Sequence, residues 1–187
     1  MVGHRAPTGG GFNLDDLPGS AGRIDILCRC VTAALALSHG IRRDAEIRLI
    51  LLGPPAPPKE VLVRGDSVRS LSPDERNTAA LLRKALALPV GETFRESSPG
   101  IFVRRGGLAG LTSGGGYAVL SEEGKDVRGE KSLPKGFILS DHLDFTPEEQ
   151  ALMAGFPRIS VGPQVLQADQ AITVLHNELD RREAGWS

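Results

Sequence analysis

The sequence contains no apolar stretch approaching the roughly 20 residues that a membrane-spanning helix needs. Its first residues, 1–5, also lack the apolar segment of a signal peptide. Hydrophobic residues make up 40% and charged residues 24% of the 187 residues, the balance of an ordinary water-soluble protein. We therefore expect one domain spanning residues 1–187, located in the cytoplasm and with no membrane partner.

Cysteine is scarce as well. Cys28 and Cys30 are the only two cysteines, and on a helix residues two apart point about 200° apart, so they cannot easily form a disulfide or share a metal ion. Two buried thiols are the simpler interpretation. The four histidines show no metal-ligand spacing. We predict no metal site.

The sequence has no excess of positive charge. Its net charge is −1, so no overall positive field would attract a nucleic acid. A nucleic-acid-binding protein of this composition must gather its arginines locally. The candidate local sites are Arg42 with Arg43, Arg64 with Arg69, and Arg104 with Arg105. Each pair by itself is more simply explained as part of a solvated surface.

Two familiar nucleotide-binding signatures are missing. The glycines at 9–11 do not follow a predicted strand, those at 114–116 do not open a helix, and the sequence contains neither a Walker motif nor a Rossmann fingerprint. A conventional NAD or phosphate-transfer site is therefore disfavoured. His142 beside Asp141 suggests nucleophilic catalysis only weakly, because adjacent residues at a strand end point apart. A core or capping role for His142 is equally compatible with the sequence.

Strand and helix patterns alternate along the chain. Apolar spacing and capping signals predict helices at residues 23–38, 72–88, 146–153 and 168–182, with capping boxes at 72–75 and 146–149. Apolar runs predict strands at residues 45–52, 61–63, 101–103, 117–120, 136–139 and 158–161, the first two joined as a hairpin by the prolines of 53–58. This alternation predicts an α/β fold with a mostly parallel sheet and helices on both faces.

Small and polar residues follow three of the predicted strands. These strand ends are residues 120–121, 140–142 and 162–163. Ligands of open α/β sheets bind beyond the carboxyl ends of the strands. Backbone amides beside apolar walls suit a cofactor with an adenine, a ribose and a charged tail. Ordinary strand-to-helix turns remain the alternative interpretation.

Several segments together resemble a known family. Residues 14–31, 38–44, 72–77, 98–105, 137–142 and 171–180 are similar, in the same order, to blocks of the archaeal tRNA pseudouridine-54 N1-methyltransferases. Each block is modest by itself, but the set covers most of the chain. These enzymes belong to the SPOUT superfamily of methyltransferases.

The resemblance implies a SPOUT-type parallel sheet and a deep trefoil knot in the C-terminal, cofactor-binding part, about residues 117–187. It also implies a homodimer, S-adenosyl-L-methionine as cofactor and tRNA as substrate. The matching cofactor positions are Leu120, Leu139, Ser140, Ser160, Val161, Gly162, Pro163, Leu166 and Ala171. Some family members carry glycine at the position of Ser140, Ser-Pro at that of Gly162-Pro163, and cysteine at that of Ala171. These departures remove no backbone amide.

The implied reaction is methylation of ring nitrogen 1 of pseudouridine at tRNA position 54. We expect Asp25 and Arg23 to reach the nucleoside as catalytic residues, although a local ion pair at the helix start would explain them equally well. Asp141 and His142 are expected to support the cofactor.

Phosphate contacts are assigned to Arg42, Arg43, Arg104 and Arg105. The alternatives are a methyltransferase of the same fold with another RNA or nucleoside target, and an RNA-binding relative without activity. A nucleotide-binding α/β protein unrelated to RNA is disfavoured by the missing phosphate loop.

Overall fold

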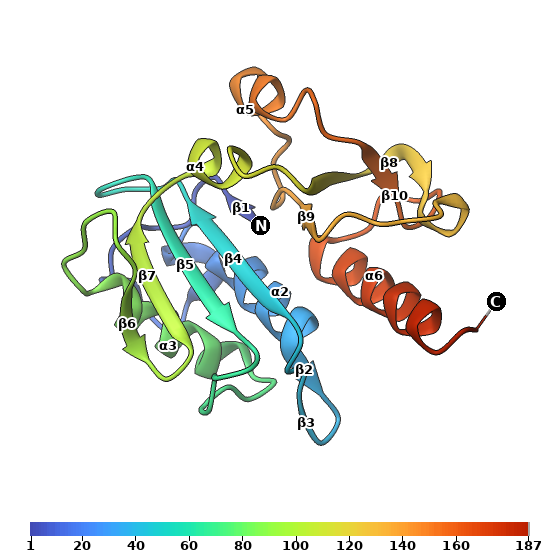
Figure 1. The fold of residues 1–187 in the computed structure, drawn as a ribbon. Helices are drawn as coiled ribbons and strands as arrows, with labels where there is room; N and C mark the ends of the chain where they lie inside the picture. Colours follow the sequence, from blue (N-terminus) through green and yellow to red (C-terminus); the bar gives the residue numbers. More distant parts are fainter. Residues whose placement is uncertain (187) are drawn as a thin grey trace.

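The computed structural model describes residues 1–186 and contains two sheets and a short hairpin. The larger sheet has the order β1-β4-β5-β7-β6, from β1 (Val2–Gly3), β4 (Glu46–Leu51), β5 (Lys59–Arg64), β7 (Ile101–Arg105) and β6 (Arg95–Ser98). The smaller sheet has the order β10-β8-β9, from β10 (Arg158–Ser160), β8 (Tyr117–Asp126) and β9 (Gly136–Ile138). Strands β2 (Ala36–Leu37) and β3 (Gly40–Ile41) form the hairpin. Figure 1 shows the two sheets side by side, with β1 between them.

Parallel and antiparallel pairing are divided between two parts of the molecule. Strand β1 pairs parallel to β4, and β8 pairs parallel to both β9 and β10. Strands β4, β5, β7 and β6 pair antiparallel with one another. The predicted hairpin across residues 53–58 is confirmed. The expectation of a mostly parallel sheet is wrong for this part, because the β4–β5 and β6–β7 connections are too short for the crossover that parallel neighbours need.

Strand β1 joins the two sheets. Val2 forms a parallel bridge with Ser140, and its backbone N–H donates to the carbonyl oxygen of Leu139 at 2.9 Å. On its other side, the N–H of Ile50 donates to the carbonyl of Met1 at 2.9 Å. The opening segment showed no strand pattern in the sequence, because two residues are too few to display one.

Helices cover both faces of the fold around β1. Helices α2 (Ile24–Leu35) and α3 (Glu75–Leu86) lie on one side of the larger sheet (Figure 1). Helix α6 (Ala168–Glu183) packs against α2. On the opposite side, α4 (Leu108–Thr112) and Met153, the residue after α5 (Pro147–Leu152), contribute to an apolar cluster with β1 and β4. No helix among the described residues is both long and apolar enough to cross a membrane.

The local signals were only partly sufficient to place the helix ends. The capping box of Thr146 and Glu149 is confirmed. Helix α3 begins after Asp74, whose side chain accepts a hydrogen bond from the N–H of Arg76, so the predicted box at 72–75 is wrong. Helix α2 ends before residue 38, because the chain turns back there as the β2–β3 hairpin. The sequence patterns also missed β6, α1 (Leu17–Ser20) and a 3-10 turn, η1 (Val127–Gly129).

Both cysteines lie in the packed interior. Cys28 and Cys30 are fully buried in α2, with neither sulfur in a disulfide. Burial raises the pKa of each thiol to about 12. The interpretation of buried thiols is confirmed.

A left-handed turn leads into α2 and orients its first side chain. Gly22 and Arg23 both have positive φ angles, 53° and 65°. A Cβ atom at Gly22 would lie 1.9 Å from the carbonyl oxygen of Arg5. Only glycine fits there, and the turn places Arg23 at the start of the helix.

We expect Gly22→Ala to lower the free energy of unfolding by more than about 2 kcal/mol, because the methyl group meets backbone and the φ angle is strained. Urea denaturation measures the change. Gly40→Ala is the matched control, since a Cβ at Gly40 meets nothing within 4 Å. Equal stabilities of the two variants would contradict this account.

Candidate functional site

A cleft of about 750 Å³ lies where the middle of β8 and the ends of β9 and β10 face the start of α2 and the segment leading into α6. Its lining includes eight of the nine predicted cofactor residues: Leu120, Leu139, Ser140, Ser160, Val161, Gly162, Leu166 and Ala171. The ninth, Pro163, is exposed and is not part of the lining. Two of the strand ends singled out in the sequence, those after β9 and β10, therefore meet around one cavity. The strand end predicted at 120–121 is wrong, because β8 continues to Asp126, but Leu120 lines the same cavity.

Two of these strand ends are held by hydrogen bonds of their own. The Ser160 hydroxyl donates to the carbonyl of Gly162 at 2.7 Å and accepts from the N–H of the same residue at 3.2 Å. The Ser140 hydroxyl donates to the carbonyl of Leu143. The amide of Gly162 thus already has a partner within the chain. A Cβ at Gly162 would meet nothing within 4 Å, so the serine of other family members would fit.

Helix α2 contributes arginines to the cleft and a carboxylate behind them. Arg23 donates to both oxygens of Asp25, from Nε at 3.0 Å and from Nη2 at 3.1 Å, and Arg29 donates to Oδ2 at 3.1 Å. Arg23 and Arg29 line the cleft, whereas Asp25 does not and is only 2% exposed. The structure therefore contains the local ion pair that the sequence left as an alternative.

The three side chains form a charged unit rather than a basic catalyst. Burial of Asp25 opposes its ionisation, but the hydrogen bonds from Arg23 and Arg29 outweigh this and lower the pKa of the carboxyl group. A carboxylate held in this way accepts protons poorly. It is better suited to fix the guanidinium group of Arg23 at the edge of the cleft.

Arg29 was not predicted as a site residue. It also donates to Glu75 at the start of α3, at 3.3 Å, and its Nε lies 3.8 Å from Asp169 at the start of α6. Arg29 Nε and Asp169 Oδ1 are both buried, with no hydrogen-bond partner. Arg29 thus connects three helices beside the cleft. Its position within a helix, surrounded by apolar residues, was the one available signal.

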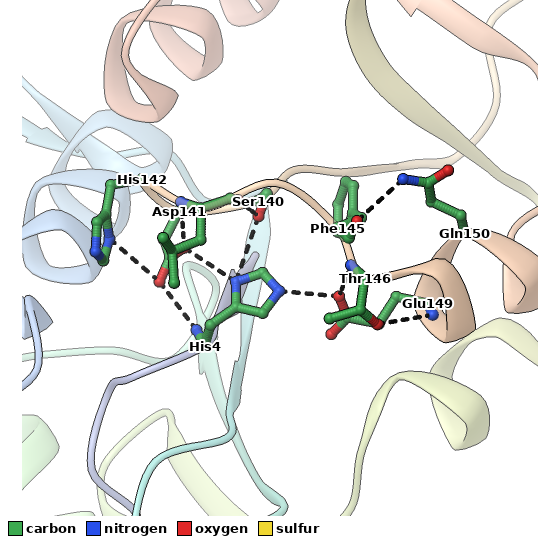
Figure 2. A network of polar contacts seen from close by, with 9 residues as sticks. His4, Ser140, Asp141, His142, Phe145, Thr146, Glu149 and Gln150 are labelled. Carbon is green, nitrogen blue, oxygen red and sulfur yellow. Dashed lines mark hydrogen bonds and ion pairs between the residues drawn. The ribbon is translucent and has the colours of Figure 1, made fainter.

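A second network missed by the sequence lies behind the cleft wall (Figure 2). His4 follows β1, and its ring lies between two carboxylates. Nδ1 is 3.0 Å from Asp141 Oδ1, and Nε2 is 2.9 Å from Glu149 Oε2. His142 lies on the other side of Asp141, with its Nδ1 3.6 Å from Oδ2. The expectation that His142 and Asp141 point apart is therefore wrong, because the chain bends directly after β9.

Both carboxylates favour the charged form of His4. Burial opposes the charge, but the hydrogen bonds to Glu149 and Asp141 outweigh it and raise the pKa of His4 above 6.5. The side chain of Asp141 is fully buried, and those of His4 and Glu149 are 10% exposed. No sequence pattern pairs His4 with residues more than 130 positions away.

The four arginines assigned to RNA are not gathered at the cleft. Arg42 forms an ion pair with Asp180, its two nitrogens 2.6 and 2.8 Å from the two oxygens. Arg43 donates to the carbonyls of Gly65 and Val68. Arg104 pairs with the buried Glu60. Arg105 is exposed at the end of β7. Three of the four thus have partners within the chain. Among residues 1–186, no three histidine, cysteine or acidic side chains are grouped to hold a metal ion.

Comparisons with known proteins agree along the whole chain. A family model described as "Putative SAM-dependent RNA methyltransferase" matches residues 1–184. Proteins named tRNA (pseudouridine(54)-N(1))-methyltransferase are similar over nearly their full lengths. That of Methanospirillum hungatei is 48% identical, covering 100% of this chain and 97% of its own. That of Methanosarcina acetivorans is 49% identical, covering 98% and 90%.

A solved structure shares the fold. The crystal structure of Archaeoglobus fulgidus Nep1 bound to S-adenosylhomocysteine superposes with a TM-score of 0.63, covering 88% of this chain and 73% of that one. Its sequence is 18% identical, so the likeness concerns the fold alone.

The role of Asp25 in holding the two arginines can be tested through stability. Because its folded pKa lies below 3.8, its contribution is present above that pH and is lost as the pH falls through the lowered pKa. We expect Asp25→Asn to cost about 2 kcal/mol at neutral pH, since three charge-assisted hydrogen bonds weaken. Urea unfolding at several pH values should show the cost shrinking towards acid. A cost independent of pH would contradict the assignment.

Proposed function

The chain belongs to the family of SAM-dependent RNA methyltransferases, and from this membership we propose that it methylates nitrogen 1 of pseudouridine 54 in tRNA. The observation that carries the proposal is sequence identity of 46–49% to several tRNA (pseudouridine(54)-N(1))-methyltransferases along essentially the whole chain. The cleft beside the strand ends is the proposed active site. The two observations are independent, since the strand ends were identified without reference to any relative.

S-adenosyl-L-methionine fits the character of the cleft. The volume falls within the range of small-molecule sites. Apolar side chains of Leu120, Leu139 and Val161 offer walls for an adenine, while Asp169 and the backbone at residues 140 and 160 offer polar partners for a ribose and a charged tail. When bound, this cofactor supplies a methyl group activated by the sulfonium. We assign cofactor contacts to the eight cleft-lining positions named above, with Pro163 at their margin.

Arg23 is the residue that we assign to the nucleoside. It is 40% exposed at the cleft while its guanidinium group is fixed by Asp25. Removing a proton from nitrogen 1 of pseudouridine leaves negative charge shared with the neighbouring carbonyl oxygens. A fixed guanidinium beside those oxygens would stabilise this charge as it develops. Asp25 acts through Arg23, since its carboxylate faces the arginines and not the cleft.

The proposal also includes the knotted domain, the homodimer and the RNA contacts that the family resemblance implies. We assign the whole chain to one SPOUT domain whose C-terminal part, about residues 117–187, carries the trefoil knot and the cofactor site. The enzyme would work as a homodimer in the cytoplasm. Arg105 is the arginine that we favour for contacts with RNA phosphates, because it is exposed and Arg42, Arg43 and Arg104 have partners within the chain.

The substrate is tested by incubating the protein with labelled cofactor and two tRNAs that differ only in having pseudouridine or uridine at position 54. Mass spectrometry of the digested nucleosides should show N1-methylpseudouridine from the first tRNA and no methylated product from the second. Methylation of both tRNAs, or of neither, would overturn the assignment. Cofactor binding without any product would favour a non-catalytic relative.

The role of Arg23 is tested by Arg23→Gln. We expect kcat to fall about 100-fold, because a preorganised charge at the reacting base is lost. The dissociation constant of S-adenosylhomocysteine should change less than about threefold, because Arg23 is assigned to the nucleoside. Arg95→Gln, at an exposed arginine outside the cleft, is the control and should leave both values unchanged. A large loss of cofactor affinity with unchanged kcat would reverse the assignment.

A further inference from the structure

We propose that His4 is a positioning residue for cofactor binding, which holds the segment of residues 140–146 as one wall of the cleft by donating a hydrogen bond from each ring nitrogen. The inference rests on the proposed function, because it concerns the same cleft and the same cofactor. His4 is not part of the cleft lining. It acts through the segment behind which it lies.

The segment contributes much of the cleft surface. Residues 139–145 all line the cleft, as does Gln150 in the helix that follows. No strand or helix includes residues 141–145. Its position therefore depends on side-chain contacts rather than on a continuous backbone ladder. The loop can hold one shape only if those contacts persist.

His4 fastens this segment at both ends. Its backbone N–H donates to Asp141 Oδ2 at 2.9 Å, and Nδ1 faces Oδ1 of the same carboxylate at 3.0 Å. Nε2 faces Glu149 Oε2 at 2.9 Å, and that oxygen also accepts from the N–H of Thr146 at 2.9 Å. Asp141 lies near the beginning of the segment and Thr146 ends it. One residue, directly after the strand that joins the two sheets, therefore fixes the wall near both of its ends.

Only the charged imidazolium can make both contacts. A neutral imidazole has one N–H, so its other nitrogen would present a lone pair to an ionised carboxylate about 3 Å away. The charged and titratable groups facing His4 are Asp141, from the segment after β9, and Glu149, from α5; His142 lies beyond Asp141. Ser140 Oγ is 3.5 Å from Nδ1, and the Phe145 ring stands edge-on 6.4 Å away.

Loss of the His4 proton should therefore loosen the wall. The stabilisation by His4 is complete below pH 6.5 and is lost as the pH rises through the raised pKa. We expect the cofactor to bind only when His4 holds the segment by both hydrogen bonds. The apparent affinity then falls in proportion to the fraction of molecules in that conformation. Cofactor affinity is then linked to the protonation of a residue that never touches the cofactor.

Glu149→Gln gives a variant in which neutral His4 still has two partners. The glutamine amide can donate to the unprotonated ring nitrogen, but it then gives up the hydrogen bond that Glu149 Oε2 accepts from Thr146, a loss that is the same at every pH. His4→Gln can reach only one of the two carboxylates. His39→Gln, at an exposed histidine in the β2–β3 turn, is the matched control.

The experiment is calorimetric titration of the four proteins with S-adenosylhomocysteine from about pH 6 to about pH 9, across the range in which a perturbed histidine titrates. The ligand's own amino group also titrates there, but it affects every protein equally and cancels in the ratio of dissociation constants. The ratio of the wild-type dissociation constant to that of Glu149→Gln should rise about fivefold or more from the lowest to the highest pH. The His39→Gln control should follow the wild type.

His4→Gln should bind about tenfold more weakly than the wild type at the lowest pH, with no further loss as the pH rises. A ratio of wild-type to Glu149→Gln dissociation constants that stays constant with pH would overturn the positioning role. So would a His4→Gln variant that binds the ligand as tightly as the wild type. Failure of the wild type to bind the ligand at any of these pH values would instead contradict the proposed function.

Discussion

The pairing of β1 between β4 and the end of β9 is the constraint on which the rest of the structure depends. Two residues, Val2 and Gly3, connect the antiparallel part of the fold to the parallel part. The cleft forms where the two parts meet, with α2 on one side and β8 and the ends of β9 and β10 on the other. His4 and the turn at Gly22 are both placed by this junction, the first by following β1 and the second by lying against Arg5.

Charge in the cleft is arranged in compensated groups. Asp25 holds Arg23 and Arg29, while Asp141 and Glu149 hold His4. Each buried carboxylate has a cationic partner, as burial of charge requires. In the proposed reaction, Arg23 would present a fixed positive group to the base although the net charge of the chain is −1. This positive charge is local, which is why composition was uninformative about RNA.

Local sequence signals were reliable where a single element determined the answer. The ends of β9 and β10, the capping box of α5 and the burial of Cys28 and Cys30 follow from patterns within a few residues. Local signals were less reliable for the end of β8, which continues to Asp126, and for α2, whose end is decided by the hairpin after it. The antiparallel pairing of β5 with β7 had no local signal, because α3 and β6 lie between them in the chain. The networks of His4 and Arg29 gave almost no signal, because their members are separated by up to 145 residues.

The sequence by itself therefore determined the α/β class, the family and the strand ends that carry the cleft, because apolar periodicity, caps and motif order are properties of neighbouring residues. The tertiary structure decided which of those residues face the cavity and which support it. It placed Asp25 behind Arg23, paired Arg42 and Arg104 with carboxylates, and brought His4 to the back of the cleft wall. Such pairings depend on the packing of distant segments. A buried charge needs a partner, and only the folded chain brings that partner close to it.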